Sequence, residues 1–242
     1  MKKSYWGIIV TYIFVLFGAS FVALGYFQAG FAEAPAIAYG QITTSVIGFL
    51  IVLFLLRSER KEGIWRREKG ASGGEAFVWI FLGVFMALAA QYIAALIEIE
   101  VLQLPAGSEN TSMLMDIFTS APLFVLYMIF FAPFFEELIF RKIIFGSIYK
   151  RTNFIIAGIV SSLAFAVLHM DFTHLLIYTA MGFVFAFLYV RTQRIIIPML
   201  VHGLMNLIVV VGQIAAQRLY PEMYEEIQNN MNAVILLLFG GF

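Results

Sequence analysis

The chain contains no cysteine and very little charge. Of its 242 residues only 12% are Asp, Glu, Lys or Arg, whereas 62% are hydrophobic. The lack of cysteine excludes disulfides, thiolate metal sites and a cysteine nucleophile. Soluble domains are about a quarter charged and about half apolar, so the scarcity of charge excludes a water-soluble fold. The 15 basic and 15 acidic residues cancel, which argues against a nucleic acid partner.

What the chain does contain is long apolar runs, and its mean hydropathy is +0.92. At roughly 20 residues per crossing, these runs predict an all-α polytopic membrane protein. We expect a bundle of about eight transmembrane helices that forms a single integral membrane domain over residues 1–242. Proline predicts an amphipathic or broken first half of the fourth run, around Pro133. The runs cover residues 6–27, 41–56, 76–97, 113–149, 153–170, 172–190, 195–217 and 232–242.

The positions of Lys and Arg predict how the chain is oriented in the cell membrane. If the N-terminus is inside, the outer segments hold a single basic residue, Arg218, and the C-terminus is also cytoplasmic. The basic stretch 57–75 is then best explained as a topology anchor rather than as a binding site for lipid or protein. The basic residues assigned to the inner side are Lys2, Lys3, Arg57, Arg60, Lys61, Arg66, Arg67, Lys69, Lys150, Arg151, Arg191 and Arg194.

A few acids and histidines fall inside the apolar runs, where such residues are costly and therefore candidates for function. Two of the chain's three histidines belong to these groups. The third, His174, follows Asp171 at a helix start, and we expect it to be an interfacial polar residue. The three groups are Glu136-Glu137…Arg141, Phe165…His169 and His202…Asn206.

Helix geometry separates the two adjacent glutamates, because neighbouring side chains point about 100° apart. Glu137 and Arg141 are four residues apart and can pair, which favours a structural role for both. Glu136 has no such partner, so we expect it to face a cavity. His202 and Asn206 share a face through the same spacing and can reach a common point.

Distances along the chain predict whether these groups meet. If two antiparallel helices are joined by a turn at residues 150–152, Glu136 lies roughly 22 Å from Arg151 along the first helix. His169 lies roughly 26 Å from Thr152 along the second helix, so both side chains reach about the same depth. His202 lies only roughly 12 Å beyond Arg194 if that stretch is helical. An extended stretch 191–197 would close the gap, and Pro198 favours a helix that begins there. With straight helices the site would lie toward the outer half of the membrane.

In order and on separate membrane helices, the three groups resemble the motifs of the CAAX protease and bacteriocin-processing family of intramembrane proteases. The resemblance covers about residues 113–212, which would form the catalytic core. It implies an eight-helix bundle that hydrolyses peptide bonds at or in the membrane. By the family pattern, Glu136 and His169 would activate a water, with Glu136 as general base, while His202 and Asn206 would hold the oxyanion. A desolvated carboxylate and donors aimed at a tetrahedral intermediate suit these roles.

Several alternatives stay open. Glu136, His169 and His202 could bind a catalytic Zn²⁺. The chain lacks the H-E-x-x-H spacing, however, and Asn is a poor zinc ligand, so we favour a metal-free mechanism without a cofactor. A non-catalytic membrane protein with a binding, immunity or regulatory role is the alternative function. A transporter would distribute its polar residues along a path. We expect the lipid bilayer and a peptide or lipidated peptide as partners, and no nucleic acid.

Overall fold

The computed structural model describes residues 2–57, 70–105 and 107–219. This part of the chain is helical and contains no strand, which confirms the all-α fold. If the continuous stretch Pro122–Tyr149 is taken as one helix, the described part has eight helices. Their bounds are α1 Lys3–Gln28, α2 Glu33–Leu56, α3 Gly73–Leu96 continued by η2 Ile97–Val101, α4 Glu109–Ser120, the stretch 122–149, α7 Phe154–Leu168, α8 Leu175–Thr192 and α9 Ile196–Leu219.

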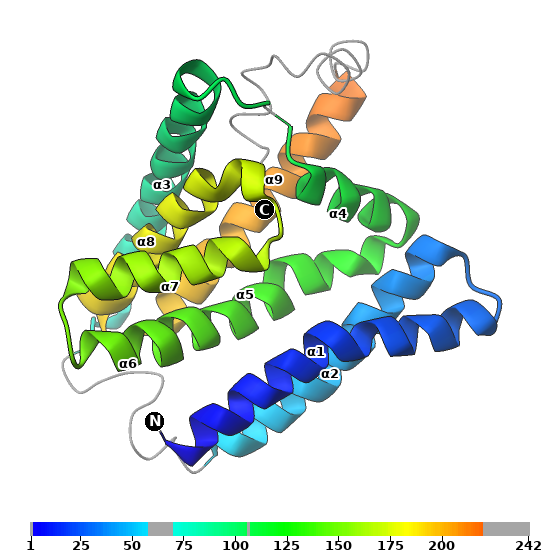
Figure 1. Ribbon diagram of the computed structural model, residues 1–242, viewed down its shortest axis with the longest axis horizontal. Helices are drawn as coiled ribbons and strands as arrows, with labels where there is room; N and C mark the ends of the chain where they lie inside the picture. The colour runs from blue at the N-terminus through cyan, green and yellow to red at the C-terminus, as the bar shows by residue number, and fades with distance from the viewer. Residues whose placement is uncertain (1, 58–69, 106, 220–242) are drawn as a thin grey trace.

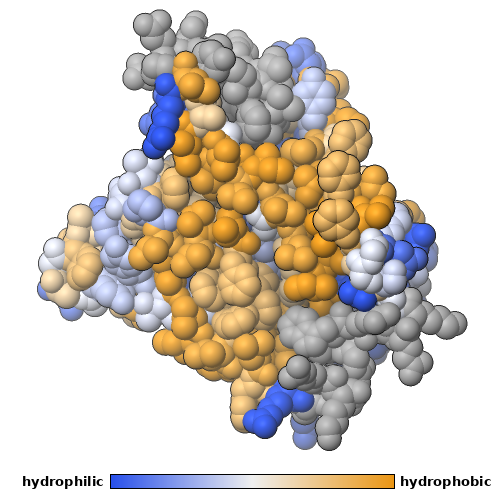
Figure 2. All heavy atoms as spheres, turned by 180° about the vertical axis from the view of Figure 1, so that it is seen from behind, coloured by the Kyte–Doolittle hydropathy of each residue, from blue (hydrophilic) through white to orange (hydrophobic). Residues whose placement is uncertain are grey.

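Six of these helices are long and apolar enough to cross a membrane, and α7 is a shorter apolar helix. The chain is therefore a multi-pass membrane protein, as its composition predicts. Figure 2 shows a broad hydrophobic surface across the middle of one face, with hydrophilic residues at its margins. Large side chains on this type of surface, such as Phe21 and Phe54, are more than 70% exposed, which suits contact with lipid.

The long stretch 122–149 consists of segments with different helical pitch. A 3-10 turn, η3 (Pro122–Phe124), leads into the π-helical η4 (Tyr127–Phe131). There follow α5 (Ala132–Glu136), the π-helical η5 (Glu137–Phe145) and α6 (Gly146–Tyr149). Wide π turns inside α-helices are frequently found at functional sites.

Two of the expected helix boundaries were wrong. The second helix begins at Glu33 rather than near residue 41. The expected fourth run is two helices that are interrupted at Ala121-Pro122, whereas Pro133 lies inside the continuous stretch 122–149. The last described helix begins at Ile196, which agrees with the expected start near Pro198, and Pro198 occupies its first turn, where a missing N–H is tolerated. The expected run 232–242 and most of the basic stretch 57–75 lie outside the described residues.

Polar side chains mark where several helices begin. The hydroxyl of Ser72 accepts from the backbone N–H of Glu75, and the Glu75 carboxylate accepts from that of Ser72, which forms a capping box at α3. Ser108 caps α4 and Asn153 caps α7 in a similar way. These caps fix the residues at which α4 and α7 begin.

Figure 1 shows α1 and α2 side by side as a hairpin along one edge of the molecule. Their close approach depends on Gly40, where an added Cβ would lie 2.8 Å from the carbonyl oxygen of Ala19. Figure 1 also shows that α9 crosses the stretch 122–149 obliquely. The N-terminus, the α6–α7 turn and the end of α8 lie at the lower left of that view. Which side of the membrane this end faces stays a prediction.

Candidate active site

The site is centred on the stretch 122–149, and Pro133 determines its backbone pattern. Pro133 has no N–H, so it cannot donate to a carbonyl four or five residues before it. The N–H of Ala132 bonds instead to the oxygen of Tyr127, five residues back. The carbonyl of Met128 is therefore left without either of its usual helical donors. A polar side chain from another helix can use this carbonyl.

Asn206 of α9 supplies that side chain. Its Nδ2 donates to the carbonyl oxygen of Met128 at 2.7 Å, and the residue is 7% exposed. A carboxamide nitrogen has two hydrogens, so one remains available toward the interior of the site. The proline in the stretch 122–149 thus fixes the position of an amide donor that comes from α9.

Glu137 has partners on both oxygens. Its Oε2 lies 3.2 Å from Nε of Arg141, at ion-pair distance although not aligned as a hydrogen bond. Its Oε1 lies 3.0 Å from Nδ1 of His202. A carboxylate paired with arginine only accepts, so Nδ1 of His202 carries the hydrogen and donates it. The expected contact between Glu137 and Arg141 is present, and Glu137 also orients the histidine of α9.

Aromatic rings surround the guanidinium of Arg141. The guanidinium carbon lies 4.2 Å from the ring centroid of Phe165 and 5.2 Å from that of Phe185. Cation–π contact of this kind is favourable in a dry interior. Phe185 also stacks on the ring of His202, with centroids 4.9 Å apart. The arginine and the imidazole are therefore held by the same packed aromatic residues.

His169 ends α7 and is fixed by two contacts. Its Nδ1 lies 2.9 Å from the carbonyl oxygen of Phe165. A carbonyl only accepts, so Nδ1 bears the hydrogen and a neutral ring has its lone pair on Nε2. The imidazole also stacks on the ring of Tyr178, with centroids 4.2 Å apart. The contacts orient His169 as an acceptor through Nε2, which suits proton transfer.

Glu136 differs from the neighbouring Glu137 in its hydrogen-bond partners. It is 7% exposed, and its Oε2 has no hydrogen-bond partner among the described residues. Nε2 of His202 lies 3.9 Å from this oxygen. Glu136, His169, His202 and Asn206 all line one cavity of about 230 Å³. The structure therefore brings together the four candidate catalytic residues from the stretch 122–149, α7 and α9.

The close crossing of α9 explains how His202 reaches Glu136. At Gly203 an added Cβ would lie 2.4 Å from the carbonyl oxygen of Ile129, so only glycine allows this approach. The chain between α8 and α9 leaves the helical state only at residues 193–195. The prediction of an extended stretch 191–197 was wrong. It rested on distances along the chain that treated the helices as parallel.

His174, which we expect to be an interfacial polar residue, belongs to a buried cluster, and its depth in the membrane stays a prediction. His174 is 3% exposed, and its Nδ1 lies 2.8 Å from Oε2 of Glu98. Glu98 lies in η2, where its Oε1 accepts from the backbone N–H groups of Leu176 and Ile177. The 76 residues between Glu98 and His174 explain why no local pattern could reveal this pair.

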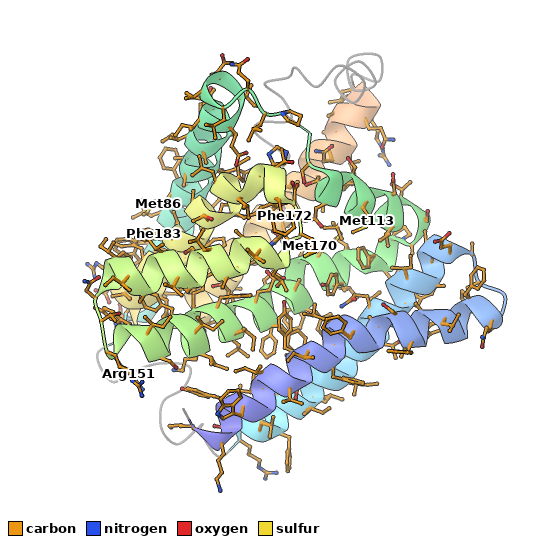
Figure 3. All side chains as sticks on the ribbon, in the orientation of Figure 1. Met86, Met113, Arg151, Met170, Phe172 and Phe183 are labelled. Carbon is orange, nitrogen blue, oxygen red and sulfur yellow. The ribbon has the colours of Figure 1, made fainter. Side chains whose placement is uncertain are left out.

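The first two helices contribute residues that no motif predicts. Tyr12 and Leu16 of α1, and Ile37 and Gln41 of α2, line the same cavity as Glu136. Residues of α4 also line it, including Met113, which Figure 3 labels beside Met170 and Phe172 of the α7–α8 turn. Their apolar and aromatic types are common throughout the chain, so only the fold distinguishes them.

The expected zinc ligands are Glu136, His169 and His202. Among the residues that the structure describes, no three His, Cys, Asp or Glu side chains form a group that could hold a metal ion. Nδ1 of His169 and Nδ1 of His202 are engaged with Phe165 and Glu137, which leaves Nε2 of each ring as the nitrogen that could bind a metal. The metal-free mechanism therefore stays a prediction, and no step below involves a metal.

Known proteins that resemble the chain show which family it belongs to. The model of the family described as Type II CAAX prenyl endopeptidase Rce1-like matches residues 118–208. The chain is 42% identical over 230 residues to a Bacillus subtilis protein named "Putative membrane peptidase YdiL", covering 92% of this chain and 94% of that protein. It is 30% identical over 219 residues to "Membrane-embedded CAAX protease MroQ" of Staphylococcus aureus, covering 84% and 87%. No solved structure matches the chain. With two relatives matched over most of their length, the chain belongs to the Rce1-like family of CAAX membrane peptidases.

Proposed function

We propose that the chain is an intramembrane endopeptidase in which Glu136 and His169 activate a water that attacks a peptide bond of a membrane substrate. The observation that carries the proposal is the convergence of four polar side chains on one cavity inside an otherwise apolar bundle. Glu136 supplies the general base, since its Oε2 has no partner among the described residues. His169 accepts a hydrogen bond from the water through Nε2.

The reaction starts when Glu136 removes a proton from the water as its oxygen bonds to the carbonyl carbon of the substrate. The carbonyl oxygen becomes an oxyanion, and the second N–H of Asn206 donates to it. His202 donates Nδ1–H to Glu137, so its Nε2 is a second donor only when the ring is protonated on both nitrogens. The proton held by Glu136 then passes to the leaving amine, and the C–N bond breaks.

The decisive variant is Glu136→Gln in the full chain, purified and placed in lipid nanodiscs. Loss of a positioned general base lowers rates by roughly 10²–10⁴-fold, and we expect a loss of cleavage of this size. The substrate is an internally quenched apolar peptide selected from a library by its cleavage with the unchanged chain. Thermal unfolding controls for folding. Cleavage by Glu136→Gln at the unchanged rate would overturn the proposal and favour a binding or regulatory protein.

Metal dependence is tested with the same assay. The unchanged chain is treated with a strong chelator, dialysed and assayed with and without added Zn²⁺. The proposed mechanism predicts the same rate in all samples. A rate that falls on chelation and returns with Zn²⁺ would replace the metal-free mechanism by a zinc-dependent one.

A further inference from the structure

Two buried polar groups on the α1–α2 side of the cavity have no use in the proposed reaction. Tyr12 is 6% exposed, and its hydroxyl has no hydrogen-bond partner among the described residues. The same holds for Nε2 of Gln41, which is also buried. Both residues line the cavity together with Glu136. A buried donor without a partner is unfavourable, so two of them in one cavity indicate a ligand that supplies acceptors.

The position of Tyr12 relates it directly to the reacting groups. Its ring stacks on Phe135, the residue next to Glu136, with centroids 5.8 Å apart. This contact holds the ring of Tyr12 at the wall of the cavity. Gln41 lies one turn after Ile37 on α2, and both side chains line the cavity. The two residues therefore line the same cavity from different helices.

The other lining residues define the chemistry of that molecule. None of the residues that line the cavity in the described part of the chain is Lys or Arg, and the only carboxylate is Glu136. A free carboxylate in this cavity would meet Glu136 and no permanent cation. Apolar side chains such as Leu16, Met113 and Phe124 form most of the remaining wall. The cavity thus favours an uncharged ligand with apolar groups and hydrogen-bond acceptors.

We propose that Tyr12 and Gln41 donate to the backbone carbonyls of an uncharged, apolar peptide segment beside the bond that is cut. The inference rests on the proposed function, since it assigns that segment to the substrate. A peptide bound in extended form presents carbonyls that need donors, because no water replaces them in a dry site. The volume of about 230 Å³ is below the roughly 300–1,000 Å³ of sites for drug-sized ligands, so it holds only part of the substrate. A lipid tail or an isoprenoid chain has no acceptor for either group.

The test measures binding of a capped peptide without cleavage. An N-acetylated, C-amidated apolar peptide with one benzophenone is titrated against the full chain in nanodiscs, with Glu136→Gln as the background. Tyr12→Phe and Gln41→Leu each remove one donor, and we expect the half-saturating peptide concentration to rise about three- to tenfold for each. Mass spectrometry of the labelled chain should locate the cross-links on α1, α2 and α4.

Matched controls exist in the same chain. Tyr26→Phe makes the same change on α1, but the Tyr26 hydroxyl already bonds to Thr43 at 3.1 Å and does not line the cavity. Gln91→Leu makes the same change at a buried glutamine of α3 outside the cavity. Both should bind the peptide like the background. Thermal unfolding of every variant shows whether it is folded.

Three results would overturn the inference. These are absence of saturable labelling by the capped peptide, binding by Tyr12→Phe and Gln41→Leu equal to the controls, and tighter binding of the same peptide with a free C-terminal carboxylate. Farnesol that displaces the peptide equally from all variants would assign the cavity to a lipid chain and also contradict it. If binding behaves as expected but the chain with Glu136 intact cleaves no peptide, the peptide site stands and the proposed function fails.

Discussion

Glu98 and Glu136 are both buried in apolar helices, yet their surroundings differ. Glu98 accepts from Leu176 and Ile177 through one oxygen and contacts His174 through the other. Glu136 has an oxygen without a hydrogen-bond partner among the described residues and faces a cavity. A buried carboxylate with all its partners joins helices together, whereas one with an open oxygen can accept a proton or hold a water. Burial alone does not distinguish the two roles, but the partners do.

The comparison extends to the neighbouring groups. Around Glu98, Asp171 accepts from the hydroxyl of Ser108 at 2.7 Å, and Nε2 of His174 lies 3.0 Å from the carbonyl oxygen of Gly107. These contacts tie the loop before α4 to the start of α8. Around Glu136, the groups that converge come from the stretch 122–149, α7 and α9 and leave a cavity between them. The group of Glu98, Asp171 and His174, here called the saturated cluster, supports the fold. The group of Glu136, His169, His202 and Asn206, here called the open cluster, is the candidate for chemistry.

The largest effect beyond Glu136 itself is expected for Asn206→Ala, which acts on the open cluster alone. Removal of one oxyanion donor lowers kcat by about 10²–10³-fold. The change also frees the carbonyl of Met128, so thermal unfolding is measured beside peptide cleavage. Asn206→Asp is the matched variant, because it keeps the shape but replaces the donor by an acceptor. Equal activity of Asn206→Ala and the unchanged chain would remove Asn206 from the mechanism.

Gly203→Ala tests whether the open cluster depends on the crossing of α9. The added Cβ would lie 2.4 Å from the carbonyl oxygen of Ile129, so α9 must move away. A shift of about 1 Å in a catalytic group can cost roughly 10²-fold in rate, and we expect a loss of this order in kcat with a smaller change in KM. Gly25→Ala is the control, since its Cβ would meet no atom within 4 Å. Full activity of Gly203→Ala would show that the crossing distance is not critical.

The smallest effect is expected at Tyr178, which links the two clusters. Its ring stacks on His169, while its hydroxyl lies 3.4 Å from that of Ser108. Tyr178→Phe keeps the stacking, so cleavage should stay within about threefold of the unchanged rate, since only two long hydrogen bonds, to Ser108 and Asn110, are lost. Tyr178→Ala removes the stacked ring and should lower kcat by about three- to tenfold. Equal loss in both variants would assign the effect to the hydroxyl.

The sequence was sufficient for the class of fold and for four of the residues that meet in the cavity, Glu136, His169, His202 and Asn206. The scarcity of charge predicts a membrane bundle, and the spacing of Glu137 and Arg141 predicts their contact. It was not sufficient for the backbone around Pro133. That proline leads to a π-helical turn rather than a break, because Asn206 of a distant helix takes the Met128 carbonyl.

Other features depend on contacts between distant segments, which local patterns do not encode. His174 pairs with Glu98 across 76 residues, so each alone looks like an interfacial polar residue. Tyr12 and Gln41 carry no motif and become candidates only where α1 and α2 meet the cavity. The depth of His202 could not be derived from residue counts, since it depends on the angle at which α9 crosses.

The most direct test of the account compares Glu136→Gln with Glu98→Gln, each assayed for peptide cleavage per folded molecule and for thermal unfolding in the same nanodiscs. Glu136→Gln should lose cleavage by roughly 10²–10⁴-fold and keep its unfolding temperature. Glu98→Gln should be destabilised by about 1–3 kcal/mol, because its histidine and backbone partners lose a charged acceptor, while the folded fraction cleaves at the normal rate. Comparable losses of activity per folded molecule in both variants would contradict the distinction between the open and the saturated cluster.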